Sequence, residues 1–286
     1  MATFYNQATL SYNGNLTSSN ITAGEILENL LVTKTPVNSV YSADRDNSYV
    51  ISIVNNGSVS YDNVTITDDL GEYTFNTPDD TVVPLTYITD TVRYFVNGNP
   101  QAAPTVTAEN PLTVTGISVP AGGNAVIVYS ARANSFAPLG EDASVTNTAT
   151  VSGDGFTDIS ASSTTTPENS AFLAISKSLS PAAVEENGRI TYTFTIQNNG
   201  GTAVDASDDV IFRDDFTPPL TGLTAQFNGT PWTEGTNYDY SETTGVFTSI
   251  AGQITVPAAT YVQDPATGAW SVQPGISTLV ITGNIS

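Results

Sequence analysis

SYVISIVNNG, at residues 48–57, recurs as TYTFTIQNNG at residues 191–200. The same offset along the chain relates LLVTKTPV at 30–37 to LAISKSLS at 173–180. In each copy apolar and polar residues alternate over the length of a strand, and an Asn-Asn-Gly turn signal follows. The sequence therefore predicts two copies of one strand-rich domain.

Three more pairs of segments follow in the same order in both copies: VTITDDL (64–70) with VIFRDDF (210–216), FVNGNP (95–100) with QFNGTP (226–231), and NAVIVYSAR (124–132) with STLVITGNI (277–285). Short alternating runs, interrupted by Asn-Gly, Pro and Asp clusters, are typical of sandwich-type all-β proteins. We therefore expect an all-β chain with one β-sandwich over 30–170 and a second over 171–286.

The first strand of the chain resembles the last strand of the first copy. ATFYNQATLSYNG, at residues 2–14, matches ASVTNTATVSGDG at 143–155, which closes the first domain. The second copy reaches Ser286 before such a segment appears, so it is expected to lack its closing strand. Residues 1–29 are therefore predicted to be an N-terminal donor strand and linker, and the strand is expected to complete the second domain of a neighbouring chain.

Two alternatives to this exchange remain at the sequence level. The strand could fold back on the second domain of its own chain, or the natural chain could continue past Ser286 with its own closing strand. The distance in sequence from Asn6 to Lys34 is similar to that from Asn147 to Lys177, which favours a head-to-tail polymer that continues the repeat within the chain.

Composition excludes several functional classes. The chain has 7 basic and 28 acidic residues and a net charge of −21, which argues against binding to nucleic acid or anionic membranes. No segment is long and apolar enough for membrane insertion. Histidine and cysteine are absent, so histidine-containing catalytic triads and Cys/His metal sites are excluded, and we expect no cofactor and no metal.

The chain has two lysines, and both occupy the same position in the repeat. Alternation of side chains along a strand predicts that the first lysine, an aspartate and an asparagine point into the core of the first domain. Each lies in a period-two row with apolar residues: Leu30, Val32, Lys34; Val64, Ile66, Asp68; and Val145, Asn147, Ala149. An unpaired lysine in an apolar core is costly, so these groups should meet.

The second domain has the lysine and the aspartate, Lys177 and Asp214, but no asparagine on a closing strand of its own. The matching residue is Asn6. It belongs to the core-facing row predicted for the donor strand: Phe4, Asn6, Ala8 and Leu10.

These motifs resemble the conserved repeat domain, of unknown function, found in tandem in surface proteins of Gram-positive bacteria. TK or SK at the start, YxxxxxNNG, TDD or RDD, and NTATV carry the resemblance. It implies immunoglobulin-like sandwiches in an extracellular stalk or fibre. The Lys, Asp and Asn set is similar to that of isopeptide-forming collagen-adhesin-type pilin domains.

The second resemblance implies an autocatalytic amide bond between a lysine and an asparagine, assisted by the acid. The expected intramolecular bond joins Lys34 to Asn147 with Asp68 as the acid, and the expected intermolecular bond joins Lys177 to Asn6 of a neighbour with Asp214. Burial favours the neutral amine and the protonated acid that this reaction needs. The alternative is a buried Lys–Asp ion pair that forms no covalent bond.

The function expected from these features is that of a structural subunit of a self-assembling extracellular filament: a pilus, a fibre or a spore appendage on a bacterial surface. Its partner is itself, and catalytic residues are not expected beyond the autocatalytic bonds. The alternative is a two-domain adhesin or stalk fragment that binds an unknown surface ligand through its second domain. One set of aromatic residues there could form an adhesive patch, but large aromatics dominate cores and interfaces, so we expect this set to pack the domain or its lateral contacts. That set comprises Trp232, Tyr238, Tyr240, Tyr261 and Trp270.

Overall fold

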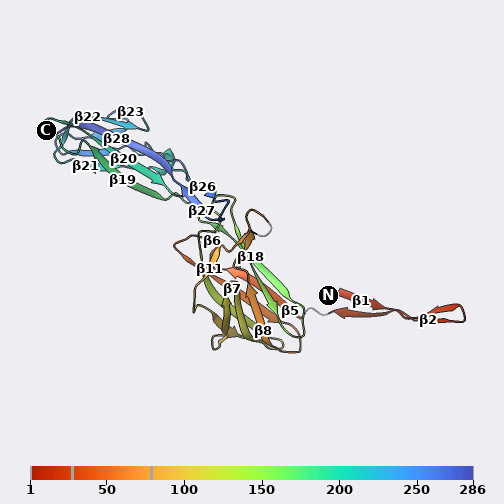
Figure 1. The fold of residues 1–286 in the computed structure, drawn as a ribbon. Coiled ribbons are helices and arrows are strands. Elements are labelled where there is room, and N and C mark those ends of the chain that lie inside the picture. The colour runs from red at the N-terminus through yellow and green to blue at the C-terminus, as the bar shows by residue number, and fades with distance from the viewer. Residues whose placement is uncertain (1, 27–28, 78–79, 286) are drawn as a thin grey trace. The chain divides into compact units, whose positions relative to one another are not determined.

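The computed structural model describes residues 2–26, 29–77 and 80–285. Apart from one short 3₁₀ helix at Ala206–Asp208, the secondary structure of these residues is entirely β. The prediction of an all-β chain with immunoglobulin-like sandwiches is confirmed. The chain divides into two compact units (Figure 1), of which unit one comprises Met1–Tyr73, Val83–Asn134 and Val145–Thr165, and unit two comprises Thr74–Val82, Ser135–Ser144 and Thr166–Ser286.

Unit one is a sandwich of two antiparallel sheets. The order in the first sheet is β13 (Asn99–Pro100), β12 (Arg93–Val96), β16 (Asn124–Ala133), β7 (Asp46–Asn55) and β5 (Leu30–Pro36), and β11 (Leu85–Tyr87) also pairs with β16. The order in the second is β14 (Thr105–Glu109), β15 (Leu112–Val119), β8 (Tyr61–Asp68), β17 (Val145–Ser152), β18 (Ile159–Pro167) and β6 (Val40–Tyr41). A separate pair, β9 (Tyr73–Thr74) and β10 (Thr81–Val82), lies almost wholly in the segment Thr74–Val82 of unit two.

Unit two repeats the first of these sheets strand for strand. Its order is β19 (Leu173–Ser180), β20 (Arg189–Asn198), β28 (Gly275–Ile285), β22 (Leu220–Phe227) and β23 (Thr230–Trp232). The facing sheet is smaller and has the order β21 (Arg213–Asp215), β25 (Val246–Ser249) and β24 (Tyr238–Tyr240). A hairpin of β26 (Thr260–Gln263) and β27 (Trp270–Gln273) stands apart from both sheets.

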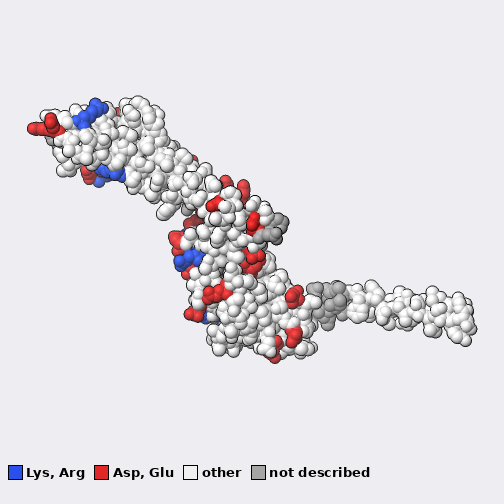
Figure 2. Space-filling model, in the orientation of Figure 1, with Lys and Arg blue, Asp and Glu red and all other residues white. Residues whose placement is uncertain are grey.

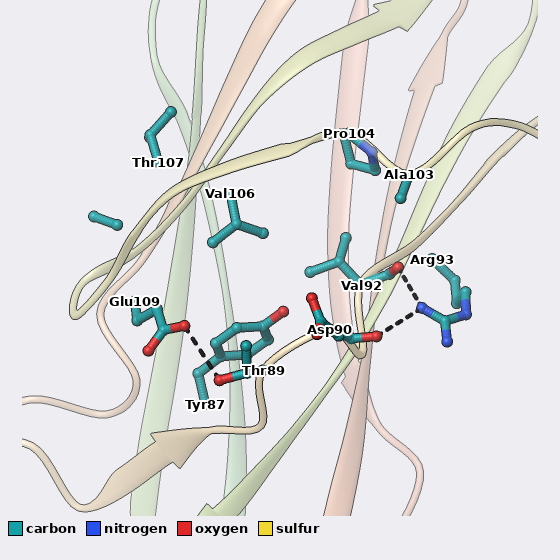
Figure 3. A pocket seen from close by; sticks show the side chains of 11 residues that line it. Tyr87, Thr89, Asp90, Val92, Arg93, Ala103, Pro104, Val106, Thr107 and Glu109 are labelled. Carbon is teal, nitrogen blue, oxygen red and sulfur yellow. Dashed lines mark hydrogen bonds between the residues drawn. The ribbon is translucent and has the colours of Figure 1, made fainter.

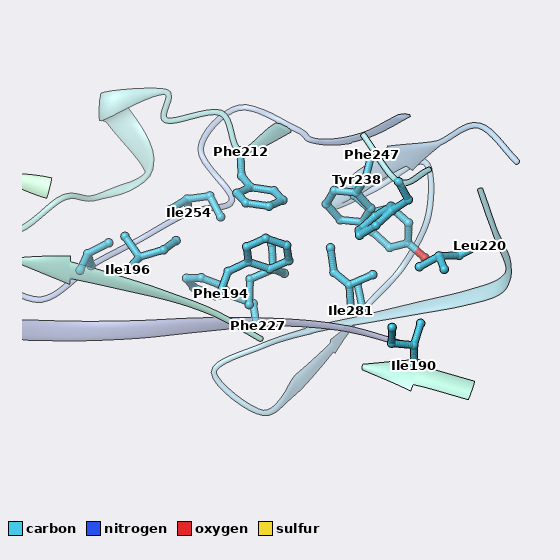
Figure 4. Packing of buried hydrophobic residues seen from close by; sticks show 14 of the residues in the cluster. Ile190, Phe194, Ile196, Phe212, Leu220, Phe227, Tyr238, Phe247, Ile254 and Ile281 are labelled. Carbon is cyan, nitrogen blue, oxygen red and sulfur yellow. The ribbon is translucent and has the colours of Figure 1, made fainter. Parts of the chain in front are cut away.

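Aromatic rings fill the core of unit two between its sheets (Figure 4). Phe212 lies edge-on to Phe194 at 4.6 Å between centroids, and Tyr238 stacks on Phe247 at 4.7 Å. Buried aromatics of this kind contribute large apolar areas to the core. Two of the aromatic residues singled out in the sequence, Tyr238 and Tyr240, pack in or against this core, which is the packing role expected of them, and the Tyr240 hydroxyl donates to the Leu220 carbonyl at 2.9 Å.

The first asparagine of each Asn-Asn-Gly motif forms hydrogen bonds across the turn that follows the second strand of its copy. The amide nitrogen of the buried Asn55 donates to the Val59 carbonyl at 2.7 Å, and its oxygen accepts from the Gly57 amide at 2.9 Å. Asn198 does the same in unit two with Thr202 and Gly200. The repeated motif is therefore a buried hydrogen-bonded bracket that sets the turn geometry.

One alignment made from the sequence is wrong by one residue. The match of 124–132 with 277–285 places Tyr129 opposite Thr282, whereas the sheets pair Tyr49 with Tyr129 and Tyr192 with Ile281. The reason is that a shift of one residue exchanges the two faces of a strand, and the buried face decides the register. Ile281 thus occupies the place of Tyr129 in unit two.

The N-terminal segment is a hairpin, where the sequence suggested a strand and a linker. β1 (Ala2–Asn6) pairs with β4 (Thr22–Ile26), and β2 (Thr9–Tyr12) pairs with β3 (Asn15–Ser18). Asn13 and Gly14 form the turn, with φ values of 49° and 77° that an Asn-Gly pair adopts readily. Within the described residues these strands pair only with one another, and Figure 1 shows them as a two-stranded ribbon.

Candidate cross-linking and docking sites

Unit one buries Lys34 against Asp68 between its two sheets. Nζ of Lys34 lies 2.7 Å from Oδ2 of Asp68, and both side chains have no exposed surface. β5 and β8 belong to opposite sheets, and the core-facing parity of each strand directs the two side chains toward one another. The structure therefore brings together two of the residues singled out in the sequence.

Asn147 joins this pair through Tyr129. The Tyr129 hydroxyl donates to Asp68 Oδ2 at 2.7 Å and accepts from Asn147 Nδ2 at 2.9 Å. Oδ1 of Asn147 is buried and has no hydrogen-bond partner among the residues that the structure describes. Burial of a carbonyl oxygen without a hydrogen-bond donor costs free energy, so the side-chain amide of Asn147 is only partly satisfied by hydrogen bonds.

Sequence reasoning missed Tyr129. Alternation along 124–133 places it on the buried face with Ala125 and Ile127, and a tyrosine in an apolar row is a signal for a buried hydroxyl that needs a partner. The alignment that was shifted by one residue concealed this signal. Tyr49 was also missed, although it opens the YxxxxxNNG motif: its ring stacks on Tyr129 at 5.4 Å and lies 5.4 Å from Lys34 Nζ.

Burial moves both charged groups of unit one toward their neutral forms. Desolvation lowers the pKa of Lys34 from its usual value, against the opposing attraction of Asp68. Desolvation likewise raises the pKa of Asp68, and the hydrogen bonds from Lys34 and Tyr129 act in the opposite direction. A neutral amine is a nucleophile and a protonated carboxyl is a proton donor, so the site has the groups needed for attack on an amide.

Unit two contains the same lysine–aspartate pair in an open setting. Lys177 Nζ lies 2.6 Å from Asp214 Oδ2, and the two side chains are 41% and 19% exposed. The rings of Tyr192, Phe194 and Phe216 surround the amine at 4.8, 5.2 and 5.3 Å. The aromatic platform is therefore present, while one side of the pair is accessible to solvent.

The strand that carries Lys177 is exposed on the face that its counterpart buries. In unit one Leu30 and Val32 are 7% and 8% exposed, whereas in unit two Leu173 and Ile175 are 37% and 57% exposed. A groove of about 160 Å³ lies here. Its lining is mostly apolar and comprises Leu173, Ala174, Ile175, Ile196, Val210, Ile211, Phe212 and Ile254.

An unpaired strand edge borders this groove. β25 pairs with one edge of β21 and, across the described residues 2–26, 29–77 and 80–285, no strand pairs with the other. In unit one the corresponding edge of β8 carries β17, with Ala149 opposite Asp68. The edge beside Asp214 is therefore the place that the closing hairpin β17–β18 occupies in unit one.

The first strand pair of the N-terminal hairpin, β1 with β4, has the register of β17 with β18. Asn6 pairs with Thr22 as Asn147 pairs with Ser163, at the same offset in both strands. Phe4 pairs with Gly24, and its ring covers that glycine so closely that a Cβ there would come within 2.4 Å. β1 and β4 thus reproduce a pair of strands of unit one, and not the closing strand alone. The pairing of β2 with β3 is shifted by one residue, since Thr9 pairs with Ser18 whereas its counterpart Thr150 pairs with Ser160.

The hairpin exposes apolar side chains and carries almost no charge. Phe4 and Leu10 are 54% and 66% exposed, and Asn6 and Ala8 are exposed with them. Residues 2–24 include no Asp, Glu, Lys or Arg, although the chain has a net charge of −21. Figure 2 shows the contrast between this uncharged segment and the acidic residues on the two units.

A second groove, of about 540 Å³, lies on unit one. There the Thr89 hydroxyl donates to Glu109 at 3.2 Å (Figure 3). The guanidinium of Arg93, which also lines it, donates to the carbonyls of Asp90 and Val92. The cation is thus already satisfied by backbone oxygens, and the groove offers no convergent set of catalytic groups.

Neither a metal cluster nor a membrane helix is found in the described part of the chain. No group of three Asp or Glu side chains is placed to hold a metal ion. No helix there is long and apolar enough to span a membrane.

No protein-family model and no curated protein matches the chain. Solved structures similar to it include the collagen-binding domain of a Staphylococcus aureus adhesin, at 15% identity and a TM-score of 0.30, over 48% of this chain and 97% of that one. They also include a D312A variant of the Bacillus cereus major pilin subunit BcpA, at 10% identity and a TM-score of 0.39, over 94% and 70% of the two chains. The Streptococcus pneumoniae pilus backbone RrgB aligns at 12% identity and a TM-score of 0.35, over 86% and 55%.

These similar structures are pilin subunits and an adhesin domain, the kinds of protein that the sequence motifs resemble.

Proposed function

We propose that the chain is a structural subunit of an extracellular filament on a bacterial cell or spore surface, assembled head to tail by its N-terminal hairpin. The single observation that carries this proposal is the match between the open edge of β21 and the hairpin, whose first strand pair, β1 with β4, has the register of the hairpin that closes unit one. The hairpin of one subunit adds its first strand to this edge in the next subunit. This is strand addition with alternate side chains entering a groove.

The arrangement in unit one defines a register for the junction. There Ala149 pairs with Asp68. The corresponding pair across the subunit boundary is Ala8 with Asp214, and the strand then carries Leu10 along the apolar groove. Docking of this kind covers the exposed faces of both partners and supplies backbone hydrogen bonds to an unpaired edge.

The absence of charge on the hairpin supports docking. Exposed strand edges in soluble proteins are commonly protected by charged residues, lysine above all, because an unprotected edge pairs with other chains. Residues 2–24 lack that protection, and acidic residues there would be repelled by a neighbour with the same net charge of −21. The hairpin therefore has the chemistry of an interface.

The proposal includes an internal amide bond from Lys34 to Asn147 in unit one, assisted by Asp68. Its support is the burial of all three side chains, the shared hydrogen-bond network through Tyr129, and the shift of the lysine and the acid toward their neutral forms. A freshly purified monomer should then weigh less than its sequence by one ammonia. A mass equal to that of the unmodified sequence would contradict this part of the proposal.

Removal of the hairpin tests the assembly itself. A chain without residues 2–26 should remain a folded monomer, because unit one keeps its own closing hairpin, and electron microscopy should find no filaments. Added peptide 2–26 should bind the shortened chain. Filaments that persist without the hairpin would overturn the proposal.

A point variant separates docking from folding. Leu10→Asp changes a side chain that is exposed in the free hairpin, so it should leave the monomer intact and abolish filaments by placing a charge in the groove. Asn15→Asp introduces the same charge on the return strand and is the matched control. If the wild-type chain stays monomeric and its groove in unit two is protected from solvent, the hairpin folds back on unit two of its own chain.

A further inference from the structure

The lysine of unit two is an incomplete copy of the site in unit one. Lys34 has a buried acid and a buried asparagine in its network, whereas Lys177 has Asp214 and an aromatic platform but is 41% exposed. The missing components are an amide and a cover. In unit one both come from the hairpin β17–β18, which carries Asn147.

The donated hairpin supplies both components in one step. Asn6 holds the register position of Asn147, as its pairing with Thr22 shows, and it lies two residues before Ala8, whose proposed partner is Asp214. We propose that Lys177 of one subunit forms an amide bond with Asn6 of the next, so that the filament is covalently continuous; this inference rests on the docking proposed above.

Docking itself would switch on the reaction. In the free chain water reaches Lys177, whose side chain is 41% exposed. Coverage by the hairpin would remove that water, as burial does at Lys34, and desolvation favours the neutral amine and the protonated acid. The subunit therefore stays unreactive until a neighbour arrives, which prevents dead-end bonds before assembly.

The atoms balance without an added reagent. Neutral Lys177 Nζ attacks Cγ of Asn6, and the Nζ–Cγ bond forms as the Cγ–Nδ2 bond breaks. Protonated Asp214 gives its proton to the departing Nδ2 and takes one from Nζ, so the acid is regenerated and ammonia leaves. Each junction is one amide exchanged for another.

The second site differs from the first in one respect that bears on this chemistry. In unit one the Tyr129 hydroxyl stands between Asp68 and Asn147, and Ile281 takes its place in unit two. Among the described residues Asp214 accepts a side-chain hydrogen bond from Lys177 alone. The acid is therefore open to an incoming amide.

The test compares native and denatured filaments of the full chain. Wild-type filaments boiled in detergent should run as a ladder of multimers, and a protease digest should contain a branched peptide that joins Lys177 to Asn6 with the loss of one ammonia. Each assembled subunit should have lost two ammonia molecules, against one in the monomer.

Two variants and a control assign the bond. Asn6→Ala and Lys177→Arg should still give filaments by electron microscopy, but detergent should reduce them wholly to monomers. Asn15→Ala, on the return strand of the hairpin, should keep the ladder. Wild-type filaments that dissolve to monomers and yield no branched peptide would overturn the covalent junction and leave docking intact, whereas wild-type chains that form no filaments would overturn both.

Discussion

The two lysine sites differ in completeness, although they are built from the same repeat. Lys34 and Asp68 have no exposed surface, whereas Lys177 and Asp214 remain 41% and 19% exposed. The aromatic residue at the start of YxxxxxNNG lies beside the amine in both, as Tyr49 or Tyr192. In unit one β17 pairs with β8 beside the site, whereas among the described residues 2–26, 29–77 and 80–285 no strand pairs with the corresponding edge of β21.

The difference extends along the whole strand that carries the lysine. β5 buries every second side chain, and all residues of β19 are exposed. Full burial of a Leu, Ile or Phe side chain contributes roughly 1.5–3 kcal/mol, so covering the half-exposed Leu173, Ile175 and Leu179 provides a substantial driving force for docking. Removal of one partner from the buried pair of unit one leaves a charge without a counter-charge, which costs free energy. This difference between the two sites can be measured.

The largest expected effect is that of Asp68→Ala. It leaves Lys34 buried without a counter-charge, which should destabilise unit one by about 3–5 kcal/mol and prevent the internal bond. Hydrogen exchange of peptides from β5 and β8 measures the loss in unit one alone. Asp62→Ala, at an exposed position of the same strand, is the matched control.

A double variant distinguishes charge from packing at that site. Lys34→Met combined with Asp68→Leu removes both charges and fills a similar volume, so it should recover most of the stability lost in Asp68→Ala. If the double variant is as unstable as the single one, shape at the site matters more than the uncompensated lysine.

An intermediate effect is expected for Tyr129→Phe. The change removes a donor to Asp68 and an acceptor for Asn147, which should cost about 1–3 kcal/mol while the ring keeps its stacking on Tyr49. It should also slow the loss of ammonia from the monomer during refolding, followed by intact mass. Unchanged stability and an unchanged rate would mean that the hydroxyl has no part in the site.

Several residues of the two lysine sites could be predicted from the sequence. Alternation assigned Lys34 and Asp68 to the core face. The Asn13–Gly14 pair is a hairpin signal, but residues 1–29 were predicted to be a strand and a linker, and the hairpin was missed. Parity names the face of a strand but not the residue it meets across the sandwich, because that depends on how two sheets pack. The hydrogen bonds of Tyr129 to Asp68 and Asn147 could not be predicted for this reason.

Two other features could not be read from the pattern. The return strands of the hairpin, 15–18 and 22–26, are polar and short, so they have little periodic signal. The exposure of β19 could not be predicted either, because its residues alternate like those of β5 and burial depends on which strands pack against them. The role of the hairpin as a donor stays a prediction for the same reason.

The smallest effect is expected for Asp214→Ala in the monomer. The pair with Lys177 is partly exposed, and ion pairs in contact with water contribute roughly 0–1 kcal/mol, so unfolding of unit two should change by no more than that. The same substitution should matter once a hairpin covers the site, because the lysine would then be buried without its acid. We therefore expect little change in hydrogen exchange of β19 and β20 in the free chain, together with weaker filaments and no multimer ladder. A loss in the monomer as large as that caused by Asp68→Ala would mean that unit two is already closed in solution, and the contrast between the two sites would fail.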